Sequence, residues 1–232
     1  MRTLVIIPTY NEKENIGVII PAIRAENPGV DILVVDDNSP DGTGRVVTDL
    51  AEKTQGVYLL SRPGKQGLGR AYLAGFAWGM DHGYEVLVEM DADFSHRPAD
   101  LVKLLKAVEN NDFAVGSRWV SGGQTVRWGI GRKAISRGGS LYARTILRYP
   151  LRDWTGGFNA WHSRVLKGID LESVRSEGYS FQIELKYRAL RRGFKGFEVP
   201  IVFEDRRVGK SKMSTKIVLE ALYRVWSIRT RA

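Results

Sequence analysis

The sequence contains no cysteine in its 232 residues, so neither a disulfide framework nor a thiolate zinc site is available to it. This absence agrees with a reducing compartment, and the cytosol is the expected location. The sequence also lacks a long apolar run. The apolar stretch at residues 4–8 is too short for a signal peptide, and charges interrupt every window of the roughly 18 to 20 residues that a spanning helix needs. Any action on a membrane is therefore expected from its surface.

Acidic residues are outnumbered: 26 Asp and Glu stand against 35 Lys and Arg, which gives a formal net charge of +9. Such a molecule is attracted to polyanions, so nucleic acid, anionic lipid headgroups and phosphorylated substrates all remain open as partners. Internal repeats and low-complexity tracts are absent from the sequence. The chain length and the hydrophobic share of 43% are those of an ordinary globular protein, and one α/β domain is expected.

Short apolar runs alternate with segments of helical spacing in the first half of the chain. The runs are residues 4–7, 32–35, 57–60, 86–90 and 113–115, and the predicted helices are 14–25, 43–53, 68–81 and 98–110. This alternation predicts a doubly wound α/β fold with a mostly parallel sheet. From about residue 122 the chain becomes basic and aromatic, and we predict helices at 133–148, 179–192 and 215–228 and a strand at 196–202.

Polar residues follow the predicted strands at the points where these end, which is where doubly wound sheets bind ligands. Two acids, Asp91 and Asp93, come directly after the run 86–90. Side chains two apart in an extended chain face the same way, so both carboxylates are expected to converge. Carboxylate oxygens suit Mg²⁺ or Mn²⁺, especially when phosphate oxygens take the remaining positions. The alternative is that the two acids cap the helix that begins near Pro98.

Two further loops have both a ligand-binding and a purely structural interpretation. Pro40, Asp41 and Gly42 form good turn chemistry, but a turn does not require the acids Asp36 and Asp37, which suggests a carboxylate that accepts hydrogen bonds from a ribose or base. Residues 65–70 place two glycines and flanking cations before a helix. They fit either a phosphate cradle or a flexible loop, and they match neither a Walker A loop nor a dinucleotide fingerprint.

Several segments together resemble a known family. Residues 8–12, 34–42, 67–69 and 90–93 resemble family 2 glycosyltransferases with a GT-A fold, which use nucleotide sugars. Residues 116–118, 132–138, 153–158 and 206–212 narrow the resemblance to dolichol-phosphate or polyprenol-phosphate mannose synthases. The resemblance spans nearly the whole chain. It implies one glycosyltransferase domain over residues 1–232, with a nucleotide-sugar half at 1–121 and an acceptor-binding, membrane-facing half at 122–232.

The resemblance also implies roles for individual residues. The nucleoside of GDP-mannose is expected at Pro8, Tyr10, Glu12, Val35 and Asp37, and the metal and diphosphate at Asp91, Ala92 and Asp93. Arg118, Arg206 and Lys212 match cations near the sugar phosphate, and Arg118 and Arg132 are expected at the acceptor phosphate. Asp91, Asp93, Arg206 and Lys212 are the expected catalytic groups. Ser95 lies where some members have a glutamine that also contacts the metal.

The implied reaction transfers mannose from GDP-mannose to a polyprenyl phosphate, with Mg²⁺ or Mn²⁺ as cofactor and inversion at the sugar. A phosphate monoester is already anionic at pH 7, so no general base is required, and neither Asp153 nor Glu184 is assigned that role. We expect a peripheral protein at the cytoplasmic face of a membrane, with a separate membrane protein as a possible anchor. The predicted helix 215–228 has an apolar face with basic flanks, which suits either a headgroup layer or packing on the sheet.

Three other functions fit part of the sequence. A family 2 transferase with another donor, such as UDP-glucose, or with a polysaccharide acceptor would keep the fold and change a substrate. A nucleotidyltransferase would use similar acids but release pyrophosphate. A nucleic-acid binder would explain the positive charge but not the clustered carboxylates, which repel a phosphate backbone, so no nucleic-acid partner is expected.

Overall fold

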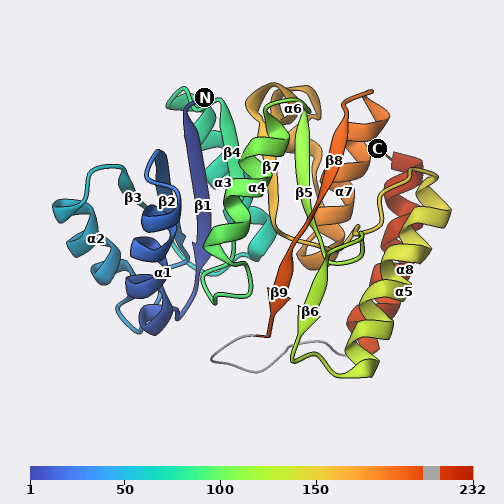
Figure 1. Ribbon diagram of the computed structural model, residues 1–232, viewed down its shortest axis with the longest axis horizontal. Helices are drawn as coiled ribbons and strands as arrows, with labels where there is room; N and C mark the ends of the chain where they lie inside the picture. The colour runs from blue at the N-terminus through green and yellow to red at the C-terminus, as the bar shows by residue number, and fades with distance from the viewer. Residues whose placement is uncertain (206–214, 232) are drawn as a thin grey trace.

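The computed structural model describes residues 1–205 and 215–231, with side chains described for 1–205 and 223–231. Within these residues, seven strands form one sheet in the order β3-β2-β1-β4-β7-β5-β8 (Figure 1). Their bounds are β1 Thr3–Thr9, β2 Val30–Asp36, β3 Val57–Ser61, β4 Val86–Glu89, β5 Phe113–Ser117, β7 Asn159–His162 and β8 Gly196–Pro200. β7 runs antiparallel to its neighbours β4 and β5, and the other neighbouring pairs of this sheet are parallel.

Helices cover both faces of the sheet because successive strand residues point to opposite sides and both sets are apolar. Val5 and Ile7 of β1 pack under one set of helices, and Leu4 and Ile6 pack under the other. The first set is α1 Lys13–Glu26, α2 Thr43–Lys53 and α4 Pro98–Val108; the second is α3 Leu68–Asp81, α6 Ser163–Gly168 and α7 Gly178–Arg191. This arrangement confirms the predicted doubly wound, mostly parallel α/β fold.

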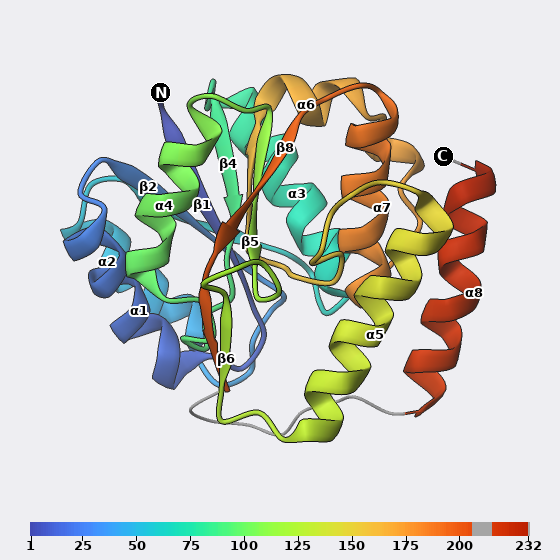
Figure 2. The same ribbon diagram turned by 45° about the vertical axis from the view of Figure 1, so that its right-hand side comes forward.

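Two more helices form a separate layer beside α7. α5 Ile130–Leu147 and α8 Thr215–Arg231 run side by side in the same direction (Figure 2), and Arg229 Nη1 donates to the carbonyl of Ile146 at 2.8 Å. Apolar residues from all three helices close a third core. They include Ala143, Leu147, Ile183, Val225 and Ile228, together with Trp154. The described part of α8 therefore packs on the helices α5 and α7 and not on the sheet. A short 3-10 helix, Leu171–Ser173, precedes α7.

A second, two-stranded sheet lies beyond the carboxyl ends of the main sheet. It pairs β6 Gln124–Val126 with β9 Val202–Glu204 in parallel. The prediction of one strand at 196–202 was wrong at its end, because Ile201 donates to the carbonyl of Ser117 and the chain then leaves β5 to pair with β6. In Figure 1 this small sheet lies low in the picture, beyond the ends of β5 and β8.

No helix in the described ranges combines the length and the apolar character that crossing a bilayer requires.

Candidate active site

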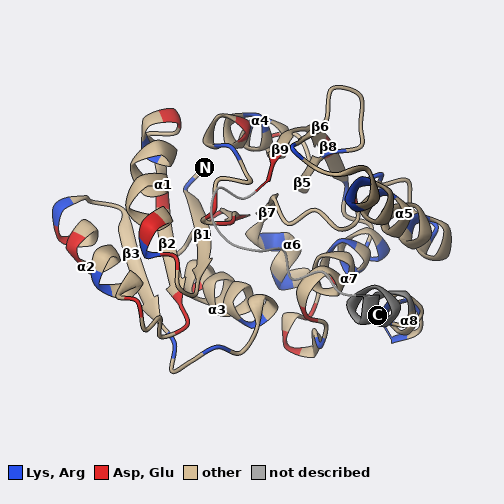
Figure 3. Cartoon of the chain, turned by 90° about the horizontal axis from the view of Figure 1, so that it is seen from below, with Lys and Arg blue, Asp and Glu red and all other residues tan. Residues whose placement is uncertain are grey.

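A cavity of about 230 Å³ opens at the carboxyl ends of the strands, and most of its lining is apolar. Its walls come from α3, the loop after β4, α5, α7, β9 and α8. Among the lining residues are Asp91, Ser95, His96, Arg118 and Arg132. Viewed from this end, acidic segments lie near the ends of the central strands, whereas basic segments lie along α5 (Figure 3). The cavity thus joins an acidic side to a basic side.

The two predicted metal-binding acids lie in a turn and not in an extended strand. β4 ends at Glu89, and Phe94 adopts a left-handed conformation with φ of 62°. Asp91 lines the cavity, and Asp93 is 6% exposed with its Oδ1 accepting from the backbone N–H of Ser95 at 3.0 Å. The two acids therefore follow β4 instead of belonging to it, and the convergence of their carboxylates stays a prediction.

Neutral side chains hold Asp91 from both sides. The hydroxyl of Tyr72 donates to Asp91 Oδ1 at 3.4 Å. Burial, and then the charges of Asp91 and Glu89, raise the pKa of Tyr72 well above its ordinary value, so the phenol keeps its proton. The backbone N–H of Asp91 donates to His96 Nδ1 at 3.1 Å, which leaves the ring proton on Nε2. Burial lowers the pKa of His96 to about 4, and its ring stacks on Phe158 as a packing residue.

The donor atoms at this turn fit a hard divalent cation. Two carboxylates lie within three residues, and the Ser95 hydroxyl beside them is buried without a hydrogen-bond partner. In the described part of the chain, no group of three or more acidic, His or Cys side chains forms a complete cage. Mg²⁺ and Mn²⁺ suit such an incomplete set, because they commonly take their remaining ligands from water and substrate phosphates.

The residues predicted at the nucleoside line the ends of β1 and β2. Asp37 is buried and lies 2.7 Å from Arg62 Nη1, while Tyr10 is exposed with Lys65 Nζ 4.2 Å from its ring centroid. Glu12 Oε2 accepts from Asn15 at the start of α1, and Pro8 is partly buried. Val35 packs wholly inside the core under α3, so only its main chain faces any ligand.

Asp36 has a structural role that the sequence analysis missed. Its carboxylate accepts from the hydroxyls of Thr9 and Ser39 at 2.8 and 2.6 Å and from the Ser39 N–H at 2.9 Å. These bonds tie the end of β1 to the loop after β2. Turn chemistry therefore does explain Asp36, although it does not explain Asp37.

Arg118 is a fully buried cation with a fixed direction. Its Nε and Nη2 donate to the two carboxylate oxygens of Asp153 at 2.8 and 2.7 Å, and Nη2 also donates to Thr155 Oγ1. Burial alone would lower the pKa of Arg118 and raise that of Asp153. Their mutual attraction reverses both shifts, so the pair stays ionised. Both carboxylate oxygens of Asp153 thus accept from Arg118, an arrangement that favours a positioning role for Asp153 over that of a general base.

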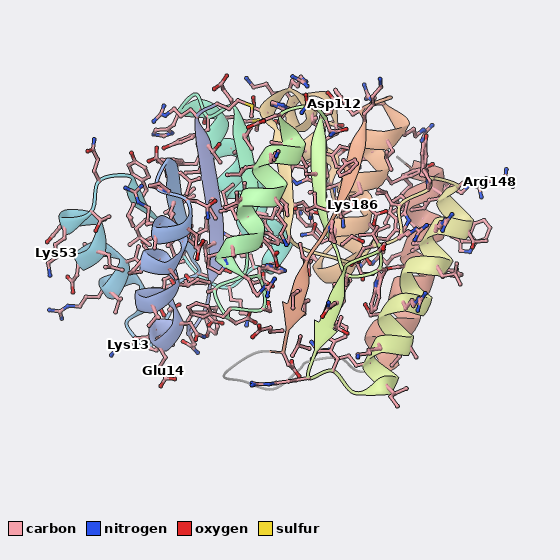
Figure 4. The ribbon with its side chains drawn as sticks, viewed as in Figure 1. Lys13, Glu14, Lys53, Asp112, Arg148 and Lys186 are labelled. Atoms are coloured by element: carbon pink, nitrogen blue, oxygen red, sulfur yellow. The ribbon has the colours of Figure 1, made fainter. Side chains whose placement is uncertain are left out.

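Lys186 supports this pair from within the protein (Figure 4). Its Nζ donates to the carbonyls of Asp153, Trp154 and Gly156 at 2.7 to 3.2 Å, which fixes the loop that carries Asp153. Burial lowers its pKa to about 8, against the opposing charges of Asp153 and Glu89. The same burial raises the pKa of Glu89 to about 7, although Trp161, Asn159 and Gln182 donate hydrogen bonds to it; the Asn159 bond measures 2.7 Å.

Arg132 lies in the first turn of α5 at the opposite wall of the cavity. Its guanidinium carbon is 4.1 Å from the centroid of the Trp128 ring, and Nη1 lies 2.6 Å from Asp205 Oδ1. Trp128 also has the Arg118 guanidinium 5.4 Å from its ring centroid. The Trp128 indole therefore contacts both of the arginines that were predicted at the acceptor phosphate.

Two predicted residues, Arg206 and Lys212, lie outside the described residues. Of the others, Asp91, Arg118 and Arg132 line one cavity, with Ala92 and Asp93 in the same turn as Asp91. Pro8, Tyr10, Glu12, Val35 and Asp37 do not line that cavity; they lie at the ends of the neighbouring strands. Sequence reasoning missed Tyr72, Glu89, Gln182 and Lys186. Two of them had a signal in the sequence: Glu89 is an acid inside the apolar run 86–90, and Lys186 is a lysine on the buried side of a helix.

The chain belongs to glycosyl transferase family 2, because residues 4–170 match the model of that family. This confirms the predicted glycosyltransferase. The narrower resemblance is confirmed by two relatives that match almost all of the chain. One is the undecaprenyl-phosphate mannosyltransferase of Micrococcus luteus, 48% identical over 100% of this chain and 96% of its own. The other is the polyprenol monophosphomannose synthase of Mycolicibacterium smegmatis, 49% identical over 99% of this chain and 88% of its own.

A more distant relative is the dolichol-phosphate mannosyltransferase of Pyrococcus furiosus, 34% identical over 98% of this chain and 64% of its own. Among solved structures, glucosyl-3-phosphoglycerate synthase from Mycobacterium tuberculosis, in complex with Mn²⁺, UDP and phosphoglyceric acid, has a TM-score of 0.74. It is 18% identical to this chain, and the match covers 98% of this chain and 78% of that one. This likeness supports the GT-A type of fold.

Proposed function

We propose that the chain transfers mannose from GDP-mannose to the phosphate of a polyprenyl lipid, with inversion and with a divalent cation as cofactor. One observation carries the proposal. Two arginines, Arg118 and Arg132, lie on a largely apolar cavity that Asp91 also lines. The apolar wall includes Ile135, Tyr142, Ile183 and Val225. A lipid phosphate matches this combination of cations and apolar surface, whereas a polysaccharide acceptor does not need it. The names of the relatives support the same substrates.

The donor would lie with its diphosphate at the turn that holds Asp91 and Asp93. Asp91 and Asp93 would hold a divalent ion there, which would supply positive charge to stabilise the departing diphosphate. Asp37 and Glu12, at the ends of the neighbouring strands, would accept hydrogen bonds from the nucleoside. Arg206 and Lys212 would add cations beside the sugar phosphate, as the family resemblance implies.

The acceptor needs positioning more than activation. A phosphate monoester carries roughly two negative charges at pH 7, so it is already a nucleophile. Asp153 and Lys186 hold Arg118 in one direction before any substrate arrives, which lowers the ordering cost of binding an anion there. In-line attack on an α-linked donor would then give a β-linked lipid product.

The test of this function is one assay with purified protein and a short polyprenyl phosphate. A panel of labelled nucleotide sugars, with and without chelator, should give lipid-linked mannose from GDP-mannose alone, and only when metal is present. NMR should report a β linkage. Preferred use of UDP-glucose would change the donor assignment, and an α-linked product would contradict inversion.

The acceptor assignment predicts a selective defect in Arg132→Ala. Its KM for polyprenyl phosphate should rise by at least about tenfold, because a charge-assisted phosphate contact is lost, while its KM for GDP-mannose stays within about twofold. Steady-state kinetics with each substrate varied would measure both. Arg192→Ala, an exposed arginine at the end of α7 away from the cavity, is the control. Equal effects on both substrates would refute the assignment of Arg132.

We also propose that α5 and α8 rest on an anionic membrane surface. Ile130 is 87% exposed and Leu141 62% on α5, and Tyr223 and Trp226 are exposed on α8. Arg137 and Arg144 of α5 are exposed as well, and so is Arg148 directly after the helix. Apolar and aromatic side chains flanked by arginines are typical of helices that lie in a headgroup layer. A surface there would bring the lipid to the cavity between these helices.

The double variant Leu141→Glu/Trp226→Glu should bind vesicles of mixed neutral and anionic lipid at least about tenfold more weakly, since two apolar contacts are lost. Vesicle sedimentation would measure the partition. The control is Val18→Glu, which adds one charge at an exposed apolar position of α1. Unchanged vesicle binding in the double variant would rule out this face as the docking surface.

A further inference from the structure

The two arginines of the cavity have carboxylate partners of different kinds. Asp153 is fully buried and meets Arg118 through two parallel hydrogen bonds. Asp205 meets Arg132 at 2.6 Å through Nη1, and the two side chains are 38% and 21% exposed. A buried, two-point pair is costly to separate, whereas a partly exposed pair is worth little in water. Arg132 can therefore change partner far more easily than Arg118.

The surroundings of Arg132 favour an anion. The residue belongs to the first turn of α5, where the backbone N–H groups and the helix dipole attract negative charge. Its Nε is buried without a hydrogen-bond partner, and its guanidinium lies over Trp128. Arg118 adds a second cation, with its guanidinium carbon 5.4 Å from the centroid of the same indole. Asp205 supplies an anion to this basic corner of the cavity.

Asp205 reaches this position from a fixed piece of backbone. It follows β9 directly, and its N–H donates to the carbonyl of Val126 in β6 at 3.2 Å. The small sheet holds the main chain here, so β6 and β9 set the position of Asp205 beside Arg132.

We propose that Asp205 is an internal competitor of the acceptor phosphate for Arg132, and that the phosphate monoester displaces it. This inference rests on the proposed function. A monoester has a charge of about −1.5 to −2 at pH 7 against −1 for the carboxylate, so the substrate is the stronger ligand. The product is a phosphodiester with a single charge. Competition by Asp205 weakens the binding of substrate and product by the same factor. The product is the weaker ligand, so this competition promotes its release from Arg132.

The test uses Asp205→Asn in the full chain, with geranyl phosphate as the probe. Removal of the competing charge should lower the dissociation constant of geranyl phosphate by about two- to fivefold, the range that a partly exposed ion pair represents. The KM for the acceptor should fall in parallel, and the KM for GDP-mannose should not change. Calorimetry measures binding without turnover, and inorganic phosphate in a parallel titration separates the headgroup from the lipid.

Two control variants make the outcome decisive. Asp112→Asn disrupts the exposed pair with Arg164 at the far end of the sheet (Figure 4) and should leave geranyl phosphate binding unchanged. On an Arg132→Ala background, Asp205→Asn should have no further effect, because the competition acts through Arg132. An unchanged or weaker affinity in folded Asp205→Asn would overturn the inference, the weaker one by indicating that Asp205 orients Arg132.

Failure of the proposed function has a different signature. A wild-type protein that neither binds geranyl phosphate nor forms lipid-linked mannose would end both proposals together. A wild-type protein that does both, with no gain in affinity in Asp205→Asn, would end only the role of Asp205. The proposal that Asp205 competes with the acceptor is supported if Asp205→Asn binds geranyl phosphate more tightly and if this gain is absent on the Arg132→Ala background.

Discussion

Asp91→Ala is expected to abolish metal-dependent turnover, with a loss in kcat of about 10³-fold or more. The metal would lose a charged ligand, and a bound metal contributes several kcal/mol of transition-state stabilisation. The fold should survive. Asp91 is only partly buried, and its bond from Tyr72 is long at 3.4 Å. Asp93→Asn tests the second carboxylate more gently, since an amide oxygen still accepts from the Ser95 N–H. Mannosyl transfer at saturating substrates, together with binding of Mn²⁺ in the presence of GDP, would measure both effects.

The matched control is Asp81→Ala, which removes an exposed acid at the end of α3. It should leave turnover and Mn²⁺ binding as in the wild type. A chelator added to the wild type should reproduce the loss seen in Asp91→Ala, and added Mn²⁺ should reverse it. Near-normal turnover of Asp91→Ala in excess chelator would remove the metal from the reaction.

The fold was largely predictable where apolar runs and helical spacing are local features of the chain. The helices 43–53 and 68–81 were predicted with the observed bounds, and all five apolar runs form strands. β7 was missed because Asn159–His162 is short and mixes polar with apolar residues. Its place in the sheet depends on pairing with β4 and β5, which lie far away in the sequence. Periodicity contains no information about such a partner.

The site was predictable in part for the same reason. Asp91 and Asp93 are conspicuous because acids follow an apolar run directly. The residues that position Arg118 are not conspicuous in the sequence, since Asp153 and Lys186 lie 35 and more residues away from it. Lys186 lies among apolar helix residues, and the sequence pattern alone predicts an exposed side chain for a lysine. Its function in the structure, three hydrogen bonds to one loop, depends on tertiary packing that local sequence patterns do not contain.

Arg118→Gln is expected to produce the second large effect, and on two quantities at once. The free energy of unfolding should fall by about 3–5 kcal/mol, because Asp153 would keep a buried charge without its main partner. Turnover should fall by about 10² to 10³-fold, because a preorganised cation beside the reacting phosphate is lost. Urea unfolding and steady-state kinetics measure the two separately. Arg192→Gln, which replaces an exposed arginine at the end of α7 away from the cavity, should change neither.

The double variant Arg118→Gln/Asp153→Asn separates the stability effect from the catalytic effect. Without both charges the buried penalty disappears, so most of the lost free energy of unfolding should return. Lys186 would still bind the three carbonyls of the loop, which preserves the local backbone. Turnover should nevertheless stay low, because the cation that would face the acceptor phosphate is still missing. A stable double variant with wild-type turnover would mean that Arg118 serves the fold alone and that the acceptor phosphate binds elsewhere.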